Sequence, residues 1–171
     1  MKNLSKKITT LVASLALVVI LGFTLTACGS KGGYSGLSYD QYKENLAKAG
    51  YEAQSIKEGD EGWDQYKESF VSEYTDDADL ISKVQWMIMA WDEKEEHNIM
   101  LMGVSDKDAA NKIYDLAKKA IDKEIEEETN EEEKAKMQNY QVFLADTVLV
   151  YGEDQTAIDA AYGKITAEKA A

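Results

Sequence analysis

Two segments near the middle of the chain are apolar at almost every position instead of at alternate ones. They cover residues 84–91 and 98–104, and a polar stretch at 92–97 joins them. Short apolar runs bounded by polar turn residues are typical of strands, and a strand that is apolar on both sides is buried on both sides. The pattern therefore predicts a β-hairpin of two central strands, or a hairpin with one adhesive face.

Helical periodicity appears on both sides of this hairpin. Ser38 and Gln41 form a capping-box pattern that opens a helix, and Gly50 is placed to end it. Aromatic residues at spacings of three and four predict a second helix over residues 63–74. After the hairpin, Ser105 is expected to cap the longest helix, which carries a continuous apolar stripe.

Shorter elements complete the predicted order. Strands are expected at residues 51–56, 140–144 and 147–151, and further helices at 130–139 and 153–162. The resulting order is one helix, then βαββαβ, then an extra strand and helix. It predicts an α+β fold with an antiparallel sheet of about four or five strands and packed helices, and is compatible with a partly ferredoxin-like arrangement.

The beginning of the chain has the three-part layout of an export signal. A basic start is followed by an uncharged apolar run at residues 8–25 and then by small residues. The run is nearly long enough to span a bilayer, so a retained transmembrane helix is the alternative. The sequence at the end of the run, Leu25-Thr26-Ala27-Cys28, contains the only cysteine of the chain and favours an export signal that is cleaved.

This tetrapeptide resembles the lipobox of bacterial lipoproteins. The resemblance implies cleavage after Ala27, lipidation of Cys28, and a protein anchored on the extracytoplasmic face of the cell membrane. The implied parts are a signal peptide at residues 1–27, the lipidated Cys28 with a flexible Gly/Ser tether at 28–37, and a single acidic α+β domain at 38–171. The domain looks like one of the small uncharacterised lipoproteins of Gram-positive bacteria.

Charge restricts the partners that such a protein can bind. The chain has 32 acidic residues against 19 basic ones, and its net charge is −13. No arginine is present, so bidentate arginine contacts to phosphate or carboxylate are absent. An acidic surface repels nucleic acid and favours basic partners or cations, and it also serves solubility. We expect contact with the membrane through Cys28, a protein or small-molecule partner, and no nucleic acid.

Candidate chemistry is sparse. His97 is the only histidine, so zinc sites built from several histidines and cysteines are excluded. A solvated loop residue is the expected role for His97, with catalysis as the alternative. Asp76, Asp77 and Asp79 are expected to form a helix cap, with a calcium or magnesium site as the alternative. The sequence predicts no catalytic residue, metal ligand or cofactor.

Four of the six methionines fall within the central hairpin. If Asp92 lies opposite His97, each methionine of one strand faces a methionine of the other. Methionine surfaces adapt to varied partners, so this face is a candidate interaction surface, and the alternative is that a helix layer covers it. The residues of this candidate surface are Met87, Met89, Trp91, Met100 and Met102.

These observations favour a membrane-anchored, non-enzymatic module that binds a ligand or partner. The alternatives are an extracytoplasmic enzyme that acts through carboxylates and a structural subunit of an envelope complex. An enzyme of that kind should have two acidic side chains facing each other, whereas a binding module should present a surface without such a pair.

Overall fold

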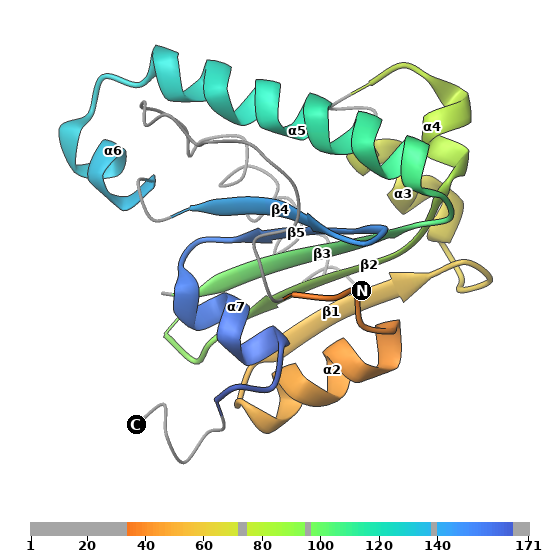
Figure 1. Cartoon of the computed structure of the whole chain (residues 1–171), viewed down its shortest axis with the longest axis horizontal. Helices are drawn as coiled ribbons and strands as arrows, with labels where there is room; N and C mark the ends of the chain where they lie inside the picture. The colour runs from red at the N-terminus through yellow and green to blue at the C-terminus, as the bar shows by residue number, and fades with distance from the viewer. Residues whose placement is uncertain (1–33, 72–74, 95–96, 138–139, 166–171) are drawn as a thin grey trace.

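The computed structural model describes residues 34–71, 75–94, 97–137 and 140–165 (Figure 1). In this part of the chain five strands form one antiparallel sheet, and helices pack against both of its faces. The predicted α+β class is therefore confirmed. The elements are α2 (Tyr39–Lys48), β1 (Glu52–Lys57), α3 (Trp63–Val71), α4 (Ala78–Ser82), β2 (Val84–Trp91), β3 (Asn98–Val104), α5 (Lys107–Glu127), α6 (Glu131–Met137), β4 (Gln141–Ala145), β5 (Val148–Gly152) and α7 (Gln155–Ala161).

The strands lie in the order β1-β2-β3-β5-β4, and every pair of neighbours is antiparallel. The predicted register of the central hairpin is confirmed, because Met87 pairs with Met102 and Met89 with Met100. Helices α5 and α6 connect β3 to β4, and β5 lies between these two strands. This is a split βαβ unit, which is the part of the fold that resembles the ferredoxin-like arrangement. The resemblance ends there, because α7 packs on the opposite face of the sheet from α5.

One face of the sheet is covered by α3, α4 and α5 (Figure 1). Trp63 of α3, Leu80 of α4 and Ile113 of α5 are buried against the inward side chains of β2 and β3. The other face is covered by α2 and α7, with Tyr42, Leu46 and Ile158 buried in a second core. Alternate side chains of a strand point to opposite faces, so two helix layers explain why the central strands are apolar throughout.

Local signals set most of the element boundaries. Both bonds of the capping box at Ser38 and Gln41 are present, so the predicted start of α2 is confirmed. The longest helix begins one residue later than predicted, because Asp106 is its N-cap and accepts a hydrogen bond from the Ala109 amide at 2.8 Å. Ser105 instead donates its amide to the Lys83 carbonyl at 2.9 Å and so extends the contacts of the hairpin.

Residues 34–37 belong to the domain, although the sequence predicts them as part of the flexible tether. The Tyr34 ring packs against Phe143 and Tyr162, at centroid distances of 5.4 and 4.5 Å. The Gly36 amide donates to the Asp146 carboxylate at 2.8 Å, in the turn between β4 and β5. The predicted signal peptide, Cys28 and the rest of the predicted tether lie outside the described residues.

Candidate functional site

A group of polar, partly buried side chains lies where the β2–β3 loop meets the turn from β5 into α7. We call it the hairpin-end cluster, and its members are Asp92, His97, Asn98, Glu153 and Asp154. The strand order creates it, because β3 and β5 are neighbours and pair Ile99 with Gly152. The Glu153 amide then donates to the Asn98 carbonyl at 3.0 Å, which holds the two segments together.

His97 is anchored in this cluster and is not the solvated loop residue that the sequence predicts. Its Nδ1 contacts the Asp154 carboxylate, and its backbone amide donates to Asp92 at 3.1 Å. The His97 and Asp154 side chains are 34% and 25% exposed. The other oxygen of Asp154 accepts from the Ala157 amide at 2.9 Å and caps α7. A single carboxylate therefore links the hairpin loop to the start of the last helix.

Glu153 sits beside this contact in a different environment. Burial raises the pKa of its carboxyl group, and a hydrogen bond from the Asn98 side chain at 2.7 Å opposes part of that rise. Two neighbouring carboxyl groups with different environments are a feature of acid–base sites. Here, however, Glu153 accepts from Asn98 and Asp154 contacts His97, so each carboxyl group already holds a neighbouring segment in place.

Tyr51 borders the same end of the sheet and is buried. Burial raises the pKa of its phenol well above the ordinary value, and the negative charges of Asp92 and Asp154 raise it further. The phenol therefore stays protonated over the physiological range. Its hydroxyl group has no hydrogen-bond partner among the described residues. A buried hydroxyl without a partner lowers stability, so this position is open to a stabilising substitution.

The candidate interaction surface is part of the core and is not exposed. Its five side chains are between 1% and 7% exposed. Helices α3, α4 and α5 cover them, and the Tyr66 hydroxyl of α3 lies 3.7 Å from the sulfur of Met89. Burial also raises the pKa of Tyr66 to about 12. The prediction of an open surface at Met87, Met89, Trp91, Met100 and Met102 is therefore wrong, and the alternative of a covering helix layer applies.

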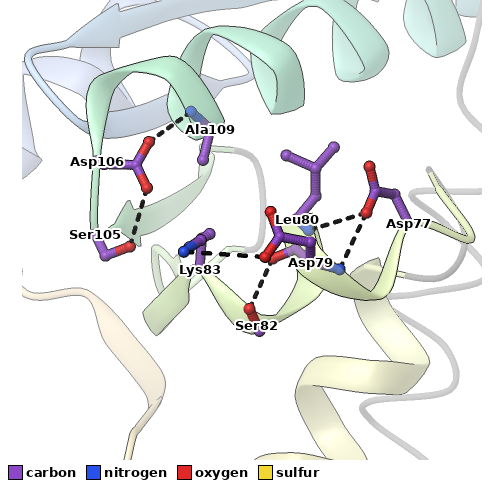
Figure 2. Close-up of polar contacts among 8 residues, drawn as sticks. All are labelled: Asp77, Asp79, Leu80, Ser82, Lys83, Ser105, Asp106 and Ala109. Atoms are coloured by element: carbon purple, nitrogen blue, oxygen red, sulfur yellow. Dashed lines mark hydrogen bonds and ion pairs between the residues drawn. The ribbon is translucent and has the colours of Figure 1, made fainter.

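The acidic stretch before α4 acts as a helix cap (Figure 2). The Asp77 carboxylate accepts hydrogen bonds from the amides of Asp79 and Leu80, at 3.0 and 3.3 Å. The Asp79 carboxylate points instead to the Lys83 ammonium, 4.0 Å away. The capping role expected from the sequence is confirmed for Asp77. In the described part of the chain, no three histidine, cysteine or acidic side chains are grouped in a way that could hold a metal ion.

A row of aromatic rings joins the start of the domain to its last helix, and the sequence pattern did not reveal it. Tyr42 donates to the Tyr162 hydroxyl at 2.9 Å, and the Leu37 amide donates to Tyr42 at 3.2 Å. Tyr34 donates to Asp159 at 3.0 Å, and the Lys164 ammonium lies 3.9 Å from the centre of its ring. This row holds residues 34–37 against the domain.

Comparison with models of known protein families, with curated proteins and with solved structures gives no match. No helix in residues 34–71, 75–94, 97–137 or 140–165 combines the length and the apolar character needed to cross a membrane.

Proposed function

We propose that this protein is a lipoprotein anchored on the extracytoplasmic face of the cell membrane, and that its domain is a non-enzymatic binding module. The observation that carries the proposal is the sequence Leu25-Thr26-Ala27-Cys28 directly after an apolar run. The packing of Tyr34 adds support, because it gives the tether a fixed end six residues after Cys28. Two acyl chains on Cys28 would supply a stable anchor, whereas one chain would bind only reversibly.

The hairpin-end cluster supports binding over catalysis. Its carboxylates at Glu153 and Asp154 each hold a side chain of the neighbouring segment, which is the arrangement of a fixed recognition surface. The exposed loop residue Glu93 lies next to Asp92, so this end of the sheet is acidic. Opposite charges steer association, so a basic partner suits this surface best.

The anchor is tested by moving the thiol. Wild-type protein, Cys28→Ser, and the double variant Cys28→Ser with Ser35→Cys are expressed in bacteria and separated into membrane and soluble fractions. We expect membrane retention and the mass of two or more acyl chains for wild type alone. The double variant is the matched control, because it keeps one cysteine but displaces it from the cleavage junction. Equal retention of all three proteins would overturn the proposal.

The binding role is tested with a photo-crosslinking amino acid at Glu93, in the hairpin loop. The matched control places it at Lys112, an exposed residue of α5 on another part of the surface. We expect a discrete crosslinked product from Glu93 in intact cells and none from Lys112. Identical patterns from the two positions would refute a specific binding surface at this end of the sheet.

A further inference from the structure

A partly exposed aromatic surface lies where the start of α2 meets the beginning of β2 and the end of β1. We call it the Tyr39–Trp86 patch, and it consists of Tyr39, Lys43, Lys57 and Trp86. The two rings meet edge to face at a centroid distance of 5.7 Å. The ammonium groups of Lys43 and Lys57 each lie 5.1 Å from the centre of the Tyr39 ring. Both lysines are exposed, and both rings are half-buried.

Trp86 differs from the other two tryptophans of the chain. Trp63 and Trp91 are only 4% and 7% exposed, whereas Trp86 is half-buried. Its indole lies directly on Gly103 of the neighbouring strand, where a Cβ atom would come within 2.1 Å of the ring. One side of the indole is thus held against the sheet while part of the ring meets solvent. Aromatic rings with one apolar and one wet side are favoured at the interface between a bilayer and water.

The patch is close to the point where the tether enters the domain. Trp86 packs on Tyr42 at a centroid distance of 5.9 Å, and Tyr42 accepts a hydrogen bond from the amide of Leu37. Tyr34 is the sixth residue after Cys28, and six extended residue steps reach about 20 Å. A bilayer that holds Cys28 therefore lies within about 20 Å of Tyr34, which is three residues before Leu37.

The two lysines of the patch favour a lipid surface as its occupant, although the exposed residues Asp40, Glu44 and Glu58 adjoin them in sequence. The chain as a whole carries a net charge of −13, but the patch presents two lysines around its rings. Lysine side chains lay their apolar stems on the interface and keep the ammonium group among the headgroups. The tether makes this contact intramolecular, so a weak attraction is enough to orient the domain.

We propose that the Tyr39–Trp86 patch lies against the headgroups of the bilayer that anchors Cys28. The inference rests on the proposed lipid anchor and adds an orientation to it. The strands then stand away from the membrane, because Trp86 lies near the start of β2 and the hairpin-end cluster lies beyond its other end. The five residues from Trp86 to Trp91 rise about 16 Å, so the cluster is displayed on the side away from the bilayer.

The test uses the lipidated protein, residues 28–171, in vesicles of phosphatidylglycerol and phosphatidylethanolamine that contain a lipid with a nitroxide on its headgroup. The nitroxide quenches nearby tryptophan fluorescence. We expect quenching of the Trp86 component in the wild type, and we expect the emission that remains in Trp86→Phe to be unquenched. Lys43→Gln with Lys57→Gln should weaken the quenching while the protein stays in the vesicle fraction. This lysine variant retains Trp86, so it tests the proposal independently if Trp86→Phe does not fold.

The matched control is Lys112→Gln with Lys119→Gln, which removes two exposed lysines of α5, on the opposite face of the sheet. Its quenching should equal that of the wild type. Protein that carries acyl chains and sediments with the vesicles, but shows no quenching of Trp86, would overturn the orientation and leave the anchor intact. Protein without acyl chains that does not sediment would overturn the proposed anchor itself.

Discussion

Met89→Lys is the sharpest test of the buried methionine face. Met89 is 2% exposed, and it lies between Gln54 of β1 and Met100 of β3 on the face covered by α3, α4 and α5. A lysine at this position cannot reach water unless the helix layer opens. The substitution should therefore destabilise the domain strongly.

The size of the effect follows from two contributions. Losing the buried methionine side chain costs about 1.5–3 kcal/mol. Burial lowers a lysine pKa by about 3–5 units, so neutralising it at pH 7 costs about 4–5 kcal/mol. The total of about 5.5–8 kcal/mol is a large part of the roughly 5–15 kcal/mol that stabilises an ordinary domain.

Urea and thermal unfolding of residues 34–171, followed by circular dichroism, give the measurement. Gln54→Lys is the matched control, because Gln54 faces the same side of the sheet but lies on the edge strand and is partly exposed. Its unfolding free energy should stay near the wild-type value. A melting temperature for Met89→Lys within a few degrees of wild type would refute the buried face.

The pH dependence provides an independent check on Met89→Lys. The buried lysine has a lowered pKa in the folded state, so the unfolded state binds more protons between that pKa and about pH 10. Stability of the variant should therefore rise with pH by up to about 1.4 kcal/mol per unit relative to Met89→Leu, which nearly conserves volume. A parallel pH profile for the two variants would contradict burial of the charge.

Four further outcomes are expected from the same domain. Glu153→Gln keeps an oxygen that can accept from Asn98 and should raise the melting temperature at pH 7. The pKa of Glu153 is raised in the folded state, so the wild type loses stability as the pH rises through that pKa and the carboxyl group ionises, whereas glutamine does not ionise. Tyr51→Phe should leave stability unchanged or raise it by about 1 kcal/mol, and a clear loss would show that the hydroxyl has a partner. Asp154→Ala and Asp106→Ala should each cost about 1 kcal/mol in urea unfolding, with a larger loss for Asp154 because it also contacts His97. A chelator should not change the melting temperature, and a drop of many degrees would indicate a bound cation.

The sequence was sufficient for features that depend on local pattern. The apolar runs predicted the bounds of β2 and β3 and their register, and the pair Ser38 and Gln41 predicted the start of α2. Serine is a residue type that often caps helices, but the backbone amide of Ser105 donates to the Lys83 carbonyl. Ser105 and Lys83 are far apart in the sequence, so a local pattern cannot predict this contact.

The polar cluster and the aromatic row could not be predicted, because both depend on which strands become neighbours. His97 and Asp154 are 57 residues apart in the chain, and Tyr34 and Asp159 are 125 apart. The methionine face was ambiguous for a related reason. A strand that is apolar on both sides must be covered on both sides, but the pattern does not say whether a helix of the same chain or a partner provides the cover.

The methionine-rich core also couples the fold to oxidation chemistry. Met87, Met89, Met100 and Met102 are at most 5% exposed, so an oxidant such as peroxide reaches their sulfur atoms only when the helix layer separates from the sheet. Oxidation then turns flexible apolar side chains into polar sulfoxides that fit the same space poorly. In an oxidising medium, each separation of the helix layer from the sheet can therefore become permanent. The rate of methionine oxidation in the core would then measure how often α3, α4 and α5 separate from the sheet.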